Sequence, residues 1–457
     1  MKSSLSRFAR MLMLALALTM SLVPPAAAQE ARTTVLRDAE AELLFRDLSR
    51  PLISAAGLSP ASVDVVLVND PEINAFVTAG QRVFIHSGLI LAADDVNELQ
   101  GVIAHELGHV AGGHSIRLQQ GIDRASGLSI ATLVLGALAM AAGAGEAAMG
   151  IMMAGQRMAL GNLLAFSRTQ ESSADQAGAK YLSAAGVSGK GILDFFGKLQ
   201  NQEYRLAVYA TESYDRTHPL SNERVAALTQ TFAKDPAWGR PPDAALDARF
   251  QRVKAKLHGF SNPKQATVKF PESDQSVPAH YARAYAYHVG GYPEKALSEA
   301  DALLSGDPRD PFFLELKGQI LLESGRPGDA IAPLREATDR SDNSPLIASM
   351  LGHALIATEK AQYFPEAKQV LKAAVGRDNE NSFAWYQLGI IYDREGDPAR
   401  AALATAERNN LEGKPKLALA SAEMAMKGIA ANSPDYLRAQ DIAMVSRAEL
   451  KKDKKKR

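Results

Sequence analysis

The sequence predicts a mostly helical protein with a small β-sheet in its N-terminal half and a stack of paired helices in its C-terminal half. Two observations lead to this prediction. Short β-branched runs at Val65–Val68, Ala75–Val77 and Val83–Ile85 are typical of strands, and a Gly-containing turn between the last two indicates a hairpin. Beyond Val277, the sequence repeats itself with a period close to 34 residues, which is typical of stacked helical repeats.

The repeats are marked by alanines at equivalent positions, with spacings of 34, 37 and 34 residues: Ala296, Ala330, Ala367 and Ala401. The run Trp385–Tyr392 fits the W-x2-L-G-x2-Y signature of a tetratricopeptide repeat. One helix pair cannot bury its apolar face alone. We therefore expect residues 277–445 to form a tetratricopeptide α-solenoid whose concave surface binds a protein partner.

Local patterns set further expectations for the N-terminal half. Apolar residues at helical spacing predict a helix from Ala31 to about Arg50, and Pro51 is expected to begin a second, short helical piece. The helical period resumes from Leu89 to Val110. The segment 259–276 contains Pro and Lys residues and is expected to be a linker.

The first 28 residues have the pattern of a secretory signal peptide. Lys2, Arg7 and Arg10 form a positive region, an apolar stretch follows, and Ala26–Ala28 supply small residues for cleavage before Gln29. The chain contains no cysteine, which excludes disulfides and thiolate metal sites. An exported, cysteine-free chain is ordinary in a bacterial periplasm, so we expect that compartment. The balance of 51 basic against 51 acidic residues gives no indication of a nucleic-acid partner.

The chemical centre is expected in the run His105-Glu106-Leu107-Gly108-His109. Histidines four residues apart project from one face of a helix and can share one metal ion. Glu106 is placed to take a proton from water rather than to act as a ligand. A catalytic zinc takes three protein ligands and leaves one position open, so a third ligand must come from elsewhere.

Glu171 is the best candidate for that third ligand, because it lies on a helix that follows the motif. Asp175 is one helical turn further on the same face and could hydrogen-bond a ligating histidine. Without the upstream motif, this pair would be indistinguishable from two surface carboxylates.

These residues resemble a known family. His105-Glu106-Leu107-Gly108-His109, Glu171 with Ala174-Asp175, and Asn74-Ala75-Phe76 together are similar to the M48 metallopeptidases. The added repeats resemble the periplasmic branch of that family that assists outer-membrane β-barrel assembly.

The resemblance implies a zincin-like metallopeptidase domain over residues 29–258 that binds one zinc ion. It also implies that His105, His109 and Glu171 are the zinc ligands, that Glu106 is the general base, and that Asp175 supports a ligand or donates a proton. By the same resemblance, the strand near Asn74-Ala75-Phe76-Val77 would pair with an extended substrate, and the partner of the repeats would be the β-barrel assembly machinery.

Two other histidines are candidates for a place near this centre. His218, in the loop Thr217-His218-Pro219-Leu220, is a candidate oxyanion donor, with Arg224 as its neighbour. Alternatively it approaches the zinc as a fourth ligand that keeps the enzyme idle, or it is a structural loop residue. His114 follows His109 by five residues, about 500° around a continuous helix, and is expected to lie off the ligand face.

An apolar stretch separates the motif from Glu171. Residues 127–145 carry no charge, and the following stretch to Phe166 contains Glu146 and Arg157. We expect an apolar helical hairpin at about 127–166 that covers the active site or contacts a membrane surface, with a true membrane span as the alternative. The basic run at residues 446–457 is expected to be a solvated tail, or else to attract an acidic surface.

Three functions are compatible with these features. The first is a periplasmic zinc endopeptidase that cleaves misfolded or misassembled envelope proteins, with the repeats for partner or client binding. The second is a repeat-based chaperone or scaffold whose peptidase activity is restrained. The third is a membrane-embedded peptidase, which depends on residues 127–145 alone.

Overall fold

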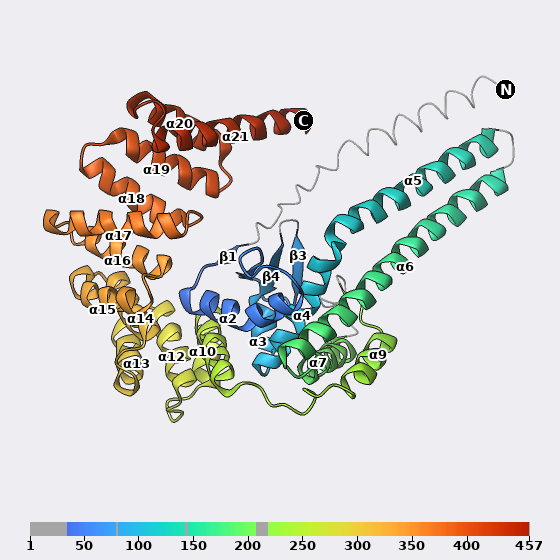
Figure 1. Ribbon diagram of the computed structural model, residues 1–457, viewed down its shortest axis with the longest axis horizontal. Coiled ribbons are helices and arrows are strands. Elements are labelled where there is room, and N and C mark those ends of the chain that lie inside the picture. The colour runs from blue at the N-terminus through green and yellow to red at the C-terminus, as the bar shows by residue number, and fades with distance from the viewer. Residues whose placement is uncertain (1–33, 79–80, 142–144, 207–217, 457) are drawn as a thin grey trace, which may run out of the picture.

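The computed structural model describes residues 34–78, 81–141, 145–206 and 218–456. The expected signal peptide and Thr217 lie outside this part of the chain. Within it, the fold is mostly helical with a four-stranded sheet, as the sequence predicts (Figure 1).

The sheet consists of β1 (Val35–Leu36), β2 (Asp64–Val68), β3 (Ala75–Thr78) and β4 (Arg82–His86), in the order β1-β2-β4-β3. Strands β2 and β4 are parallel, whereas β3 pairs with β4 in the predicted antiparallel hairpin. The pairing places β3 at an edge of the sheet.

Strand β1 is a correction to the sequence analysis, which expected a helix from Ala31. The helix α2 (Ala39–Ala55) begins later because the Asp38 side chain caps it by accepting a hydrogen bond from the Ala41 N–H. The two residues of β1 pair with β2 instead.

The break expected at Pro51 is also wrong, because α2 continues through this residue to Ala55. Leu44, Leu48 and Leu52 form one fully buried stripe along α2, on both sides of the proline. We attribute the continuity to this burial, which offsets the loss of the backbone hydrogen bond that proline cannot donate.

Helix α4 (Val96–Gly112) is the central element of the peptidase core, and residues 96–109 are all buried. It packs against α2, α7 (Lys190–Leu206) and the C-terminal half of α6 (Gly145–Ala185). The contact with α6 is close because Gly108 has no side chain: a Cβ at that position would lie 2.7 Å from the carbonyl oxygen of Ala174. Further helices in the described part of this half are α3 (Ser87–Ala92), α9 (Asn222–Phe232) and α10 (Ala244–Ser261).

The predicted apolar hairpin is formed by α5 (His114–Ala141) and α6, and it is longer than expected at both ends. Figure 1 shows that it projects away from the rest of the molecule. Its apolar part therefore does not cover the chemical centre, which corrects that expectation. The same helix α6 continues without interruption from the hairpin into the peptidase core.

The C-terminal half is the predicted solenoid of helix pairs. Part of the expected linker is also helical, since α10 extends to Ser261 and α11 follows at Pro263–Lys269. The repeat helices are α12 (Val277–Val289), α13 (Pro293–Gly306), α14 (Pro311–Glu323), α15 (Pro327–Arg340), α16 (Pro345–Ala357), α17 (Phe364–Arg377) after the 3-10 turn Ala361–Tyr363, α18 (Ser382–Arg394), α19 (Pro398–Leu411), α20 (Pro415–Gly428) and α21 (Pro434–Lys456). The basic tail is thus an extension of α21 to Lys456.

The turns inside the repeats show why these pairs form. Gly325 and Gly396 have φ angles of 78° and 74°, a left-handed conformation that ends one helix without a Cβ clash. Pro327 and Pro398 then begin the next helix, where a missing N–H has no cost.

The first repeat is joined to the peptidase half by buried polar contacts. The hydroxyl of Tyr281 donates to Glu40 at 2.6 Å, and Lys256 Nζ lies 3.1 Å from the same carboxylate. Arg252 pairs with both Glu40 and Asp310 at 2.8 Å. These contacts therefore hold α2, α10 and the first repeat in one packed arrangement.

Candidate metal centre

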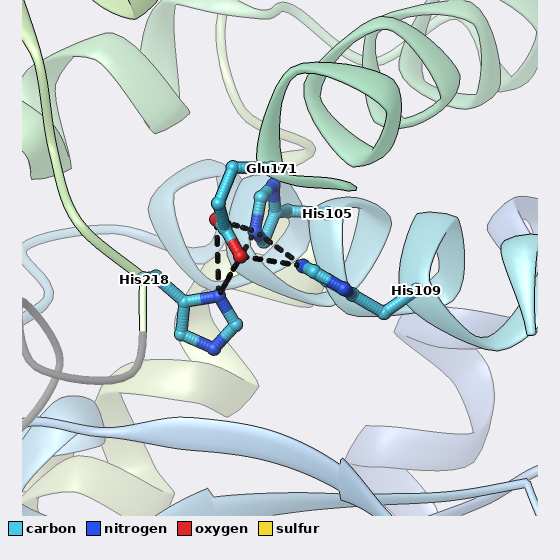
Figure 2. A group of neighbouring side chains, drawn as sticks. All are labelled: His105, His109, Glu171 and His218. Carbon is cyan, nitrogen blue, oxygen red and sulfur yellow. Dashed lines mark hydrogen bonds and ion pairs between the residues drawn. The ribbon is translucent and has the colours of Figure 1, made fainter. Parts of the chain in front are cut away.

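Four side chains from three elements converge at one point in the peptidase core. His105 and His109 lie one turn apart on α4, Glu171 comes from α6, and His218 precedes α9 (Figure 2). All four are buried, and one ligand atom from each lies within 4.8 Å of the others. Each of these residues was predicted from the sequence as a candidate for the metal centre, and the fold brings them together.

The distances match the edges of a coordination tetrahedron. The Nε2 atoms of His105 and His109 are 3.1 Å apart, and each lies 3.3–3.4 Å from a carboxylate oxygen of Glu171. His218 Nδ1 lies 3.3 Å from His105 Nε2 and 3.2 Å from both Glu171 oxygens. Ligands at about 2.0–2.1 Å from a tetrahedral zinc are about 3.3 Å from each other. The residues present therefore fit a metal ion.

Each of the three imidazoles has its outer nitrogen held by a partner. His105 Nδ1 faces Asp175 Oδ1 at 3.0 Å, and His109 Nδ1 faces His114 Nδ1 at 2.9 Å. His218 Nε2 lies 3.3 Å from the carbonyl oxygen of Ala75. A proton on each outer nitrogen leaves the inner nitrogen with its lone pair directed at the common point, which is the form that binds a metal.

The position of His114 corrects the sequence analysis. A continuous helix would carry its ring away from His109, but α4 ends at Gly112 and is followed by Gly113, whose φ of 62° is left-handed. His114 begins α5 in a new direction and returns to the centre. Burial lowers the pKa of His114, which keeps it neutral and able to accept a hydrogen bond from His109.

Arg224, on α9, contacts both carboxylates that α6 contributes to the centre. Its Nε and Nη2 atoms donate to the two oxygens of Asp175 at 2.7 and 2.8 Å, and its Nη1 lies 3.1 Å from Glu171. Nη1 also donates to the carbonyl oxygen of Pro219 at 2.7 Å, beside His218. From the sequence, Arg224 was expected only as a neighbour of His218. Its bidentate pair with Asp175 was not predicted.

The electrostatics of the two motif histidines are opposite. Burial alone lowers the pKa of His105, but the adjacent Asp175 and Glu171 carboxylates raise it to about 10. Burial and the charge on His105 lower the pKa of His109 to about 2. Burial opposes ionisation of Glu171, yet His105 and His218 hold its pKa well below the usual range. The carboxylates thus stabilise a positive charge on His105, and this charge disfavours a second one on His109.

Glu106 faces the same centre but is not part of the ligand set. It is 0% exposed, and neither of its carboxylate oxygens makes a hydrogen bond within the described part of the chain. His218 Nε2 lies 3.4 Å from Oε1, and burial raises the pKa of this carboxyl. A buried carboxylate without a hydrogen bond is suited to hold a water molecule and to take its proton.

Comparison with known proteins agrees with this geometry. Residues 40–232 match the model of peptidase family M48. The chain contains an M48 peptidase domain. This confirms the predicted family and the prediction of a metallopeptidase, and the match ends at Phe232, the last residue of α9.

Three relatives show how far the similarity extends. The β-barrel assembly-enhancing protease of Escherichia coli strain K12 is 26% identical over 382 residues, which is 81% of this chain and 75% of that protein. A putative β-barrel assembly-enhancing protease of Vibrio cholerae is 27% identical over 62% of this chain and 58% of its own length. The metalloprotease LoiP of Escherichia coli is 31% identical over 38% of this chain and 64% of its own length. Similarity to the first relative therefore extends well beyond the peptidase domain.

Proposed function

We propose that the protein is an exported zinc endopeptidase that cleaves misfolded or misassembled envelope proteins in the periplasm. The observation that supports this most is the set of three imidazoles whose outer nitrogens are held by Asp175, His114 and the Ala75 carbonyl, so that their inner nitrogens meet at Glu171. Such partners are typical of metal-ligating histidines.

In this proposal His105, His109 and Glu171 hold the zinc ion. A bound zinc ion supplies Lewis acidity, because it polarises the scissile carbonyl and lowers the pKa of water toward neutrality. Glu106 accepts the proton of the attacking water and later delivers it to the leaving amine. Asp175 fixes the ring of His105, and Arg224 fixes both carboxylates by charge-assisted hydrogen bonds.

The substrate is an extended chain that pairs with the edge strand β3. The position of β3 supports this, because an edge strand can accept one further strand and α4 packs against it. The Ala75 carbonyl at the start of β3 lies 3.3 Å from His218 Nε2, which places the strand beside the centre. An unfolded segment fits such a site, whereas a folded domain does not.

His218 keeps the enzyme idle at rest. Its Nδ1 lies at the fourth corner of the ligand set, while its Nε2 faces both the Ala75 carbonyl and Glu106. The His218 imidazole therefore fills the open metal position. It also blocks the Ala75 carbonyl, which is the first pairing group of the edge strand, and the carboxylate of Glu106. Cleavage requires His218 to move away, so the alternative role as oxyanion donor is less well supported.

The repeats deliver the client or bind an assembly partner. The solenoid fold and the similarity of most of the chain to a β-barrel assembly-enhancing protease support this part of the proposal. The partner we propose is the β-barrel assembly machinery of the outer membrane.

The test compares Glu106→Gln with Glu171→Ala in the purified protein. Glu106→Gln should retain one zinc per chain and lose cleavage of an unfolded protein by at least about 10³-fold, because it removes the base and no ligand. Glu171→Ala should lose zinc as well as activity. Parental cleavage by Glu106→Gln would contradict the mechanism, and full zinc occupancy in Glu171→Ala would remove Glu171 from the ligand set.

The second candidate is a chaperone or scaffold with restrained peptidase activity, and the closed position of His218 favours it. Rescue of a cellular defect by Glu106→Gln as complete as by the parent would identify this function, because the variant keeps the fold and the repeats.

A further inference from the structure

The hairpin formed by α5 and α6 carries a large apolar surface that no other described part of the chain covers. Only 6% of the most apolar stretch of α5 is buried, although this helix is long and apolar enough to cross a membrane. The exposed apolar side chains beyond Ile130 on α5 and before Arg157 on α6 are Leu133, Val134, Leu135, Leu138, Met140, Met149 and Met153.

The distribution of these side chains favours lipid over a protein partner. At 100° per residue, the exposed apolar positions of α5 from Ile130 to Met140 cover roughly 220° of the helix circumference. A helix that docks on one protein surface needs an apolar stripe of only about 100°. The remaining face is occupied by α6: a Cβ at Gly155 would meet Thr132, and one at Gly136 would meet Met152. Helix α5 is therefore apolar on nearly all of its free surface between Ile130 and Met140.

Apart from Glu146, the charges of the hairpin lie on the peptidase side of its apolar part. Between Arg124 and Arg157 the sequence contains a single charged residue, Glu146, next to the turn. Nearer the peptidase core, Arg117, Arg157 and Arg168 are exposed, against one exposed carboxylate, Asp123. Arg157 lies at the edge of the apolar part, and Arg117 and Arg168 lie roughly 16–20 Å further along the hairpin axis, toward the peptidase core. This basic collar, defined as these three arginines, matches the negative charge of anionic phospholipid headgroups.

The length of the apolar part fits one leaflet. Residues 147–156 of α6 precede Arg157, and at 1.5 Å per residue they measure about 15 Å. The hydrocarbon core of a bilayer is about 30 Å thick, so a full span would draw Arg157 into the hydrocarbon. The contact between Gly155 and Thr132 shows that Arg157 is level with Ile130, so the available depth of α5 is similar.

We infer that the α5–α6 hairpin inserts into one leaflet of an anionic phospholipid membrane, with Arg157 at the headgroups and Arg117 and Arg168 on the aqueous side of them. Helix α6 continues from Arg157 to Glu171, a rise of about 21 Å along its axis. If the proposed function holds, membrane binding holds the metal centre near that distance from the lipid surface, where it meets chains close to the membrane.

The test uses the chain that begins at Gln29, with vesicles of phosphatidylcholine containing 30% phosphatidylglycerol, and measures binding by flotation. The variant Leu135→Asp/Leu138→Asp should bind at least about tenfold more weakly, because two side chains lose their burial in lipid. Val268→Asp is the matched control, since Val268 is 80% exposed on α11 and should leave binding unchanged. Binding should weaken in pure phosphatidylcholine and on Arg157→Gln.

Insertion depth can be measured directly because the chain has no cysteine. A single Leu138→Cys labelled with a polarity-sensitive dye should shift to shorter emission wavelength with vesicles and be protected from an aqueous quencher. The same dye on Val268→Cys should show neither effect. Quenching of the Leu138→Cys label from the vesicle lumen would indicate a full span and contradict the one-leaflet inference.

Two other results would overturn the inference. Equal vesicle binding by the parent and the double aspartate variant would exclude the hairpin as the lipid contact. A parent that is dimeric in light scattering, does not bind vesicles and becomes monomeric in the double variant would identify a second copy as the occupant. Glu106→Gln should bind vesicles like the parent, so a failure of lipid binding is distinct from a failure of the proposed catalysis.

Discussion

The two halves of α6 belong to one helix but have opposite surroundings. The C-terminal half, which carries Glu171 and Asp175, is packed so closely against α4 that the backbones of Gly108 and Ala174 touch. The N-terminal half projects from the molecule and exposes Met149, Met153 and Leu160. The difference shows that the local sequence is sufficient for helix formation in both halves. The neighbouring elements determine at which residues a substitution is tolerated.

The largest effect is expected in the packed half, on removal of Arg224. Arg224→Ala leaves Asp175 and Glu171 buried without their guanidinium partner, which should lower the free energy of unfolding by about 3–5 kcal/mol. Zinc affinity should also fall, by roughly 10- to 100-fold, because the ligands lose their support. Denaturant unfolding and competition with a chelating dye measure the two effects. The matched control is Arg168→Ala, which removes an exposed arginine of α6, and an equal loss in both variants would contradict this account.

The next effect is expected on activity. If His218 closes the site in about 90–99% of molecules, His218→Ala should raise basal cleavage of a fluorogenic peptide roughly 10- to 100-fold. If His218 instead donates to the oxyanion, turnover should fall by roughly 10²–10³-fold. Zinc content and melting temperature must be measured alongside. Unchanged cleavage with normal folding would leave His218 a structural residue of the loop.

The packed and exposed halves of α6 can be compared most directly with a glycine-to-alanine substitution made at each of them. Gly108→Ala adds a Cβ 2.7 Å from the Ala174 carbonyl oxygen and should lower the free energy of unfolding by about 1–3 kcal/mol. Gly161→Ala, in the exposed half of α6, has no heavy atom within 4 Å of the added Cβ and should raise it by up to about 1 kcal/mol. Urea unfolding of both variants measures the pair. Shifts of the same sign would show that the two halves differ less than their packing indicates.

The smallest effect on folding is expected on α5, which pairs with the exposed half of α6. Leu135→Asp should change the free energy of unfolding by less than about 0.5 kcal/mol, because the side chain is 54% exposed in the protein. Peptide cleavage in solution should also match the parent. A loss comparable to that of Gly108→Ala would mean that the hairpin is folded against another part of the molecule.

The sequence predicted the parts of the structure that depend on short-range periodicity. The strand hairpin, the helix with His105 and His109, and the repeats around Trp385 all follow from spacing within a few residues. Glu171 lies 62 residues beyond His109 and was proposed from its place on a helix after the motif, and the family resemblance implied the same role.

The rest depended on contacts that no local pattern encodes. His114 was placed wrongly because Gly113 ends α4 and redirects the chain, so the angular argument for a continuous helix did not apply. Arg224 pairs with Asp175 across 49 residues, and Tyr281 reaches Glu40 across 241. Continuation of α2 through Pro51 is likewise a result of burial, which the sequence alone does not report.

The buried joint at Tyr281, Glu40 and Lys256 has a consequence for how the repeats work. A flexible tether would let a captured chain search a large volume before it met the edge strand. A joint fixed by buried charges instead restricts the repeats to one orientation relative to the peptidase domain. Once a client is bound to the repeats, its encounter with the edge strand is intramolecular and has a high effective concentration. Geometry then becomes the selecting factor: a client is processed only if its free segment can span the distance from the repeats to β3.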